Sequence, residues 1–312
     1  MAQRHGFFQY IRLKLAAIFI RFVVGRMAGP GLAKDLARSV HQRKIVYIPS
    51  RDPGRSIKAW LYSPPDSTAP QTKKPIVINW HGSGFMIPSF GQDVAFCSHV
   101  ARETGAIVLD ADYRKGPEDP FPAAVYDVED TLKWVASQPE QFDLDRVAVS
   151  GFSAGANLAL VAASTLRKQL PQIQIPIVVA AYPPTNIAAD PASKTVPNPK
   201  RPIPTSVATL FNDCYVPEVE LRADPRISPT YAEPALFPAT VAIFTCEGDT
   251  LAPEGIALAE KLDDGQRKLI NINLKGTHHA FDKGCEPGTN EWEQREYMHK
   301  ISVENLKEAL GL

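Results

Sequence analysis

A serine between two glycines is the residue in this sequence best placed to do chemistry. Ser153 lies in GFSAG (151–155), directly after the apolar run 147–150 and directly before the Ala- and Leu-rich stretch 156–166. The first run predicts a buried strand and the second a helix. G-x-S-x-G in this context is typical of a nucleophilic serine on a tight turn, with the N–H of Ala154 beside the point of attack. The alternative is an ordinary glycine-rich turn with a surface serine.

A base must accept the proton of this hydroxyl, because a neutral serine is a poor nucleophile. The usual base is an imidazole, held in one tautomer by a carboxylate. His278 and His279 follow the predicted strand 268–274, and spacing does not choose between them. A surface loop is the alternative interpretation. Two adjacent histidines without carboxylates at ligand spacing do not indicate a metal site.

The carboxylate that would orient this base is Asp249, which follows the predicted strand 241–246. Glu247 and Glu254 are rival carboxylates, and capping the helix that starts near Pro253 is the alternative role of Asp249. Serine, then aspartate, then histidine is the chain order of the α/β-hydrolase plan. Three matches in this order, each after a separate strand, together indicate a hydrolase.

A second glycine-rich turn, HGSGF (81–85), ends the predicted strand 76–80. A tetrahedral oxyanion also needs backbone N–H donors from a loop other than the one that carries the serine. The turn lies where the HGGG-type motif of lipases and esterases belongs, and its glycines let the backbone approach a substrate. A purely structural turn is the alternative.

The elements that must position these residues alternate between strand and helix. This alternation predicts a mostly parallel sheet with helices on both faces, and a site at the carboxyl ends of the strands. The proline-rich run 183–238 interrupts the pattern and predicts an insertion with one short helix near 202–211. The expected strands are 44–47, 56–62, 76–80, 106–110, 147–150, 177–181, 241–246 and 268–274, and the expected helices are 92–103, 122–136, 156–166, 253–262 and 291–310.

The first 40 residues have apolar side chains at helical spacing, interrupted by basic ones. The basic residues argue against a transmembrane helix, and no signal-peptide cleavage site follows. We expect a helix packed on the main domain. A basic amphipathic helix that contacts a membrane through residues 1–25 is the alternative, and an uncleaved anchor is the third. The apolar residues are Phe8, Ile11, Leu15, Ile18, Phe19 and Phe22, and the basic ones are Arg12, Lys14, Arg21 and Arg26.

The composition argues against several classes of partner. The 312 residues include 34 Lys and Arg and 34 Asp and Glu, so no net charge attracts nucleic acid. The four cysteines lie far apart without a C-x-x-C pattern, and no N-glycosylation sequon occurs. We therefore expect reduced thiols, a cytoplasmic location, no metal and no organic cofactor. The sequence leaves the oligomeric state open.

Five stretches resemble the hormone-sensitive-lipase-like branch of the α/β-hydrolases, in that family's order between residues 76 and 285. They are HGSGF (81–85), DYRKGPE (112–118) with PFPAA (120–124), GFSAGANLA (151–159), GDTLAPEG (248–255) and HAF (279–281). The resemblance implies a carboxylester hydrolase with Ser153 as nucleophile and Asp249 as orienting acid. It selects His279 as base, because the family's histidine precedes a small residue and then Phe.

The resemblance also implies an oxyanion hole and a cap. The N–H groups of Ser83, Gly84 and Ala154 would bind the oxyanion, with His81 and Gly82 in support. The family's cap is built from the N-terminal segment and an insertion after the sixth strand. The implied catalytic domain comprises 46–184 and 236–312, and the implied cap comprises 1–45 and 185–235.

Three positions depart from the family pattern. Ser83 replaces a glycine; its N–H can still donate, but its Cβ restricts positive φ and would narrow the acyl side. Phe152 replaces the acidic residue common before the nucleophile, and Pro253 replaces an acidic residue after Asp249. None of these changes removes a member of the triad. They bear on substrate preference more than on the chemistry.

The expected function is hydrolysis of short to medium acyl esters through an acyl-enzyme, with a small-molecule ester as the partner. A capped site favours such soluble esters over bulk fat. An amide, carbamate or lactone hydrolase on the same triad is one alternative. A non-catalytic protein that binds small molecules in the same pocket is the other.

Overall fold

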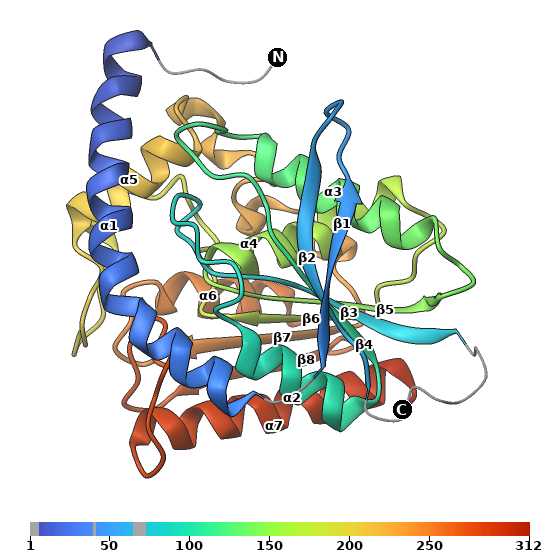
Figure 1. Ribbon diagram of the computed structural model, residues 1–312. Helices are drawn as coiled ribbons and strands as arrows, with labels where there is room; N and C mark the ends of the chain where they lie inside the picture. Colours follow the sequence, from blue (N-terminus) through green and yellow to red (C-terminus); the bar gives the residue numbers. More distant parts are fainter. Residues whose placement is uncertain (1–5, 40–41, 65–72) are drawn as a thin grey trace.

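The computed structural model describes residues 6–39, 42–64 and 73–312, and its centre is an eight-stranded sheet (Figure 1). The strands are β1 (Arg43–Pro49), β2 (Ser56–Tyr62), β3 (Lys74–Trp80), β4 (Ile107–Ala111), β5 (Phe142–Phe152), β6 (Ile177–Ala181), β7 (Thr240–Cys246) and β8 (Lys268–Leu274). Their order is β1-β2-β4-β3-β5-β6-β7-β8. β2 is antiparallel to β1 and β4, and the other neighbours are parallel. The predicted mostly parallel sheet is confirmed.

Helices cover both faces of this sheet (Figure 1). The main helices are α1 (Phe7–Arg38), α2 (Val94–Thr104), α3 (Ala123–Ala136), α4 (Ala154–Val161), α5 (Thr205–Tyr215), α6 (Ala252–Leu262) and α7 (Asn290–Leu310). Helices α3, α4 and α6 pack on one face, and α2 and α7 pack on the other. Successive side chains of a strand point to opposite faces, so Ile78 joins the first core and Val77 joins the second.

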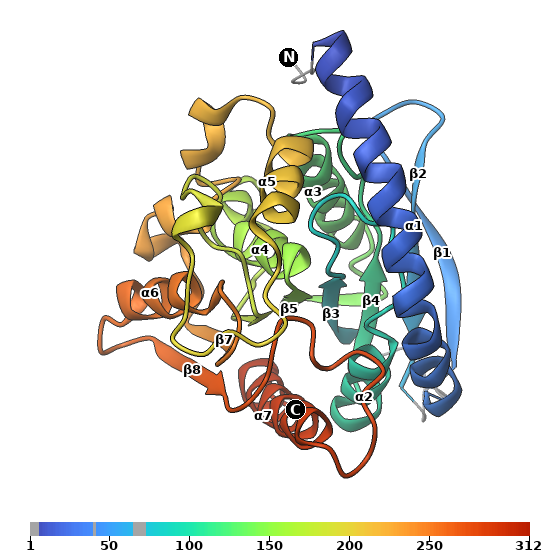
Figure 2. The ribbon, with the colours of Figure 1, turned by 90° about the vertical axis from the view of Figure 1, so that its left-hand side faces the viewer.

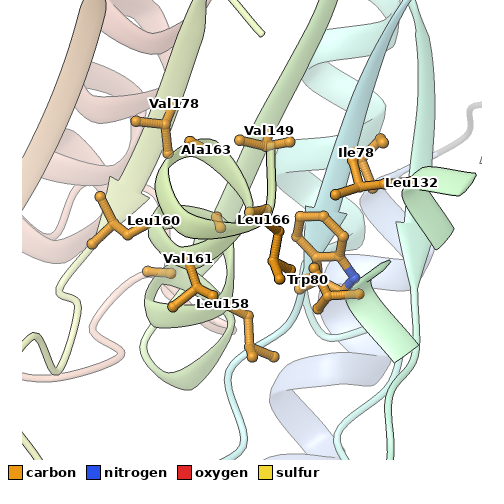
Figure 3. Close-up of a cluster of buried hydrophobic side chains, with 14 of the residues drawn as sticks. Ile78, Trp80, Leu132, Val149, Leu158, Leu160, Val161, Ala163, Leu166 and Val178 are labelled. Atoms are coloured by element: carbon orange, nitrogen blue, oxygen red, sulfur yellow. The ribbon is translucent and has the colours of Figure 1, made fainter. Parts of the chain in front are cut away.

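Helix α4 is apolar on all sides apart from Asn157, whose amide donates to the carbonyl oxygens of Pro184 and Ile227. All eight of its residues are buried, and the chain continues in one π-helical turn, η1 (Ala162–Leu166). Figure 3 shows Leu158, Leu160 and Val161 in the cluster that α4 forms with the sheet. The Ala- and Leu-rich composition of this stretch therefore serves both helix formation and core packing.

The insertion between β6 and β7 contains more helical structure than the sequence predicted. The expected short helix near 202–211 is α5, which begins and ends a few residues later. Four single turns account for the rest of the difference, and three of them begin with a proline, which fits the first position of a helical turn. These turns are η3 (Pro191–Ser193), η4 (Val219–Ala223), η5 (Pro229–Tyr231) and η6 (Pro234–Leu236).

Helix α1 lies along the outside of the molecule and contacts α2 and α5 (Figure 2). Its side chains Leu13 and Ala17 are buried in a small cluster with Met86 and Cys214. Near the other end of α1, Leu32 and Leu36 pack against the α2 and α7 core. In the described ranges, no helix is long and apolar enough to cross a membrane.

An ion-pair cluster fixes α1 to the loop 112–118. Arg21 makes a bidentate contact with Glu118 at 2.6 and 2.7 Å, and Lys14 pairs with the same carboxylate. Arg21 also donates to the carbonyl oxygens of Met86 and Gly116, at 3.0 and 2.9 Å. Burial alone raises the pKa of Glu118, but the hydrogen bonds from Arg21 and Lys14 outweigh it and lower the pKa to about 2.

We predict that Glu118→Gln lowers the free energy of unfolding by about 1–2 kcal/mol near neutral pH, because two partly buried cations lose their partner. The folded-state pKa lies below the ordinary value of 4.5, so the carboxylate's contribution is complete above that value. It disappears as the pH falls toward about 2. Urea unfolding of both proteins at a series of pH values tests this. A difference between them that persists unchanged in acid would contradict the prediction.

Candidate active site

The turn between β5 and α4 holds Ser153 in an unusual backbone conformation. Ser153 has φ 50° and ψ −120°, a backbone conformation that residues other than glycine rarely adopt. Its glycine neighbours allow this turn to pack tightly. A Cβ on Gly151 would lie 2.3 Å from the carbonyl oxygen of Gly155, and a Cβ on Gly155 would lie 1.9 Å from that of Trp80. The GFSAG sequence is therefore required by the approach of α4 to β3.

The structure brings Ser153, His279 and Asp249 into a continuous chain of contacts. Ser153 Oγ lies 2.8 Å from His279 Nε2, and His279 Nδ1 lies 2.7 Å from Asp249 Oδ2. The two contacts suit one tautomer, in which Nδ1–H donates to the carboxylate and Nε2 accepts from the serine hydroxyl. This arrangement can remove a proton from the serine while the carboxylate stabilises the resulting imidazolium.

Asp249 is the carboxylate that reaches the histidine. It is buried, and its other oxygen accepts a 3.1 Å hydrogen bond from the N–H of Leu251, the residue before α6. Asp249 is not the N-cap of α6, which is Leu251, so the alternative capping role is not observed. Glu247 instead accepts from Gly276 N–H at 2.8 Å and pairs with Lys275. The other rival, Glu254, pairs with Lys194 at 2.6 Å.

His278 points elsewhere, although it adjoins His279. Its Nδ1 lies 2.8 Å from the carbonyl oxygen of His279, and its Nε2 lies 3.2 Å from Arg201 Nη1. A guanidinium can only donate, so Nε2 accepts and Nδ1–H donates to the carbonyl. Its described contacts link the histidine loop to the insertion rather than to Ser153.

The turn after β3 presents Ser83 and Gly84 to the same cavity as Ser153. The positive φ values in this turn occur at Gly84 (54°) and Phe85 (55°), so a serine at position 83 requires no left-handed backbone. Ser83 Oγ lies 2.7 Å from the hydroxyl of Tyr113, which donates to the carbonyl oxygen of His81 at 2.7 Å. The Ser83 hydroxyl thus helps to hold the turn.

Across the cavity, Ala154 is the first residue of α4, so its N–H has no acceptor within the helix. Together with the N–H groups of Ser83 and Gly84, it is a candidate donor to an oxyanion. The positive end of the helix dipole adds to the attraction for negative charge at this point.

His81 and Gly82 support this turn from within the protein. His81 is fully buried, with Nδ1 2.9 Å from the carbonyl oxygen of Gly82 and Nε2 3.1 Å from Asp112 Oδ1. Burial and the nearby Lys115 charge lower the pKa of the His81 imidazole. The Gly82 carbonyl also accepts a 2.6 Å hydrogen bond from Gln92. The turn is therefore fixed on both sides by hydrogen bonds.

A cavity of about 650 Å³ opens over Ser153 and His279. Most of its lining is apolar, and it comes from three parts of the chain: helix α1, the insertion and the loops at the carboxyl ends of the strands. The apolar residues include Val24 and Met27 of α1, Ile187, Ile203, Val207 and Phe211 of the insertion, and Leu251. Such a cavity suits a ligand with a hydrocarbon portion and one polar group at the serine.

Sequence reasoning missed several residues at this site. Tyr182 follows β6 with φ 41°, and its ring lies 4.9 Å from that of His279. Its hydroxyl donates to Asp282 at 2.7 Å. The only feature of the sequence that could have indicated Tyr182 was its position at the carboxyl end of a predicted strand. Val24 and Met27 of α1 were not singled out by any local pattern, although the resemblance assigned their segment, 1–45, to a cap.

The sequence and the fold of this chain are similar to those of known hydrolases. A family profile described as the alpha/beta hydrolase fold matches residues 77–283. An esterase of Mycobacterium tuberculosis is 32% identical over 239 residues, covering 73% of this chain and 72% of that one. An ethyl acetate hydrolase of Pseudomonas putida is 27% identical, covering 83% and 78%. The solved structure of a Pyrobaculum calidifontis esterase has a TM-score of 0.76 at 27% identity, covering 94% and 92%.

We predict that Gly155→Ala lowers the free energy of unfolding by about 3 kcal/mol, because the new methyl group meets the backbone of β3. Chemical denaturation followed by circular dichroism measures this. The matched control is Gly25→Ala on α1, where a Cβ would meet nothing within 4 Å. We expect that variant to be as stable as the parent or slightly more stable. Equal stability of the two variants would show that the close approach is absent.

Proposed function

This chain belongs to the alpha/beta hydrolase fold family, in its hormone-sensitive-lipase-like branch of carboxylesterases, and from this premise we propose that Ser153, His279 and Asp249 are its catalytic triad. The observation that carries the proposal is the 2.8 Å contact from Ser153 to His279, continued at 2.7 Å to Asp249. An enzyme of this family acts by covalent catalysis rather than by simple ligand binding.

The reaction begins with attack of Ser153 Oγ on the ester carbonyl carbon. His279 Nε2 takes the serine proton as the new C–O bond forms, and Asp249 stabilises the imidazolium. The carbonyl oxygen becomes an oxyanion, which accepts hydrogen bonds from the N–H groups of Ser83, Gly84 and Ala154. His279 then gives its proton to the leaving alkoxide. The alcohol departs, and the acyl group remains bound to Ser153.

Water completes the cycle by the same route. His279 removes a proton from a water molecule, whose oxygen attacks the acyl carbon. The second oxyanion accepts hydrogen bonds from the same N–H groups. Its collapse breaks the bond between the acyl carbon and Ser153 Oγ. The proton on His279 returns to the serine oxygen, and the carboxylic acid leaves. No step requires a group that the chain does not supply.

The cavity supports a preference for short to medium acyl chains. Segments 1–45 and 185–235, proposed here as the cap, contribute most of its apolar lining. A volume of about 650 Å³ accommodates a small ester together with its alcohol portion, but not a bulky triglyceride. Phe211 limits the space further, because its ring packs where a Cβ on Gly84 would lie.

We predict that Ser153→Ala lowers kcat/KM for p-nitrophenyl butyrate by about 10⁴-fold or more, because the nucleophile is lost. Asp249→Asn should lower kcat by a similar factor, since the imidazole would adopt the wrong tautomer. The control is Ser137→Ala, which changes an exposed serine at the end of α3. Turnover by Ser153→Ala at the parent's rate would contradict the proposed triad.

The acyl preference gives a separate prediction. Across p-nitrophenyl esters of increasing acyl length, kcat/KM should be greatest for short to medium chains and fall at least tenfold for long ones. Phe211→Ala should shift this profile toward longer chains, because it enlarges the cavity beside Gly84. The measurement is the initial rate for each ester at concentrations below its critical micelle concentration. A profile that rises steadily to the longest chains would contradict the proposed preference while leaving the triad intact.

A further inference from the structure

One face of α1 presents large apolar side chains to solvent. Seven residues of its first half are between 42% and 86% exposed. We call this set the outer stripe: Phe7, Phe8, Ile11, Leu15, Ile18, Phe19 and Phe22. Single exposed apolar residues are ordinary, but a contiguous group of this size marks an interaction surface.

Helical spacing places the outer stripe on a single face. At 100° per residue its members fall within an arc of about 120°, and they extend along about 22 Å of the helix. Leu13 and Ala17 lie on the opposite side, where they are buried against the rest of the protein. The helix is therefore apolar on two faces, and the fold uses only one. Its N-terminal turns project beyond the neighbouring elements (Figures 1 and 2).

The charge on α1 is basic. The stretch from Phe7 to Lys34 contains five Arg and Lys residues and no Asp or Glu. Lys14 and Arg21 are used within the fold, since both pair with Glu118. Arg12 and Arg26 are exposed, and in the described part of the chain no ion pair involves either of them. In the helical projection Arg12 lies about 20° outside the arc of the outer stripe, and Arg26 lies inside that arc, one turn beyond Phe22.

We propose that the outer stripe binds the surface of an anionic lipid bilayer. An amphipathic helix with aromatic and aliphatic residues on one face and cations beside them suits the boundary between acyl chains and anionic headgroups. A second copy of this chain suits the surface less well. Two such helices packed about a two-fold axis would bring Arg12 and Arg26 of one copy toward the same cations of the other, with no acidic residue on the first 28 residues of α1 to balance them.

The position of the active-site cavity suggests a role for the membrane contact in substrate uptake. This inference rests on the proposed function. Val24 and Met27, directly after the outer stripe, line the cavity above Ser153. Both project to the side of α1 that carries Leu13 and Ala17, but Met27 is 77% exposed, so the cavity lining reaches the protein surface just past the end of the outer stripe. An apolar ester concentrated in the bilayer would have a short path along α1 from the lipid to the cavity. The substrate class would therefore include esters that partition into membranes.

Vesicle flotation of the full chain tests the proposal. We expect the parent to float with vesicles of phosphatidylcholine containing about 30% phosphatidylglycerol, and less with phosphatidylcholine alone. The triple variant Phe8→Ser, Phe19→Ser, Phe22→Ser should bind at least tenfold more weakly to both. Arg12→Gln with Arg26→Gln should lose most of the preference for the anionic vesicles.

The matched control changes three exposed apolar residues outside α1: Val219→Ser, Tyr231→Ser and Leu312→Ser. It should float like the parent. All variants should hydrolyse p-nitrophenyl acetate at the parent's rate without vesicles, which shows that they are folded. A parent that stays in the aqueous layer with both lipids would overturn the proposal, as would a triple variant that floats like the parent. So would sedimentation showing a parent dimer that the triple variant dissociates, with no vesicle binding.

A failure of the proposed function would look different. Ser153→Ala should float as the parent does, because the outer stripe is intact, whether or not it hydrolyses esters. Loss of flotation with normal hydrolysis of soluble esters removes only the membrane contact. Normal flotation by a parent that hydrolyses no ester removes only the proposed function.

Discussion

The close approach of α4 to β3 is the constraint on which the site depends. The Cα of Gly155 lies so near the backbone of Trp80 that no side chain fits between them. This approach fixes the turn in which Ser153 has its rare conformation and holds that turn close to Gly82 in the turn after β3. A larger residue at position 155 would separate the nucleophile's turn from the turn that carries Ser83 and Gly84. Core packing and the geometry proposed for catalysis thus have one origin.

The turn that carries the candidate oxyanion donors is held by segments outside the sheet. The ring of Phe85 stacks on Tyr215 at the end of α5, with 3.7 Å between centroids. Arg21 of α1 donates to the carbonyl oxygen of Met86 at 3.0 Å. Helix α1 and the insertion therefore do more than line the cavity, because they also contact the turn that carries the candidate N–H donors. Changes at the contacting residues, Arg21 and Tyr215, are expected to alter the rate as well as the selectivity.

Local patterns predicted the sheet and its helices, since the strands are buried apolar runs and the helices have clear periodicity. The order of Ser153, Asp249 and His279 after three strands pointed to residues that the structure brings together. Long-range packing was not predictable. Nothing local indicates that Tyr182 contacts His279 or that α1 lines the cavity. The expectation that the Cβ of Ser83 restricts the turn was also not met. The residues with positive φ are the next two, Gly84 and Phe85, so Ser83 needs no left-handed conformation.

The insertion enters and leaves the sheet at neighbouring strands. β6 and β7 pair in parallel from Ile177 with Thr240 to Ala181 with Phe244, so hydrogen bonds already align the strands on either side of it. Its length is therefore nearly independent of the stability of the sheet. Evolution can lengthen, shorten or recombine this segment while the reacting groups remain unchanged. A family built on this fold can thus evolve new substrate specificities while it keeps the same reaction.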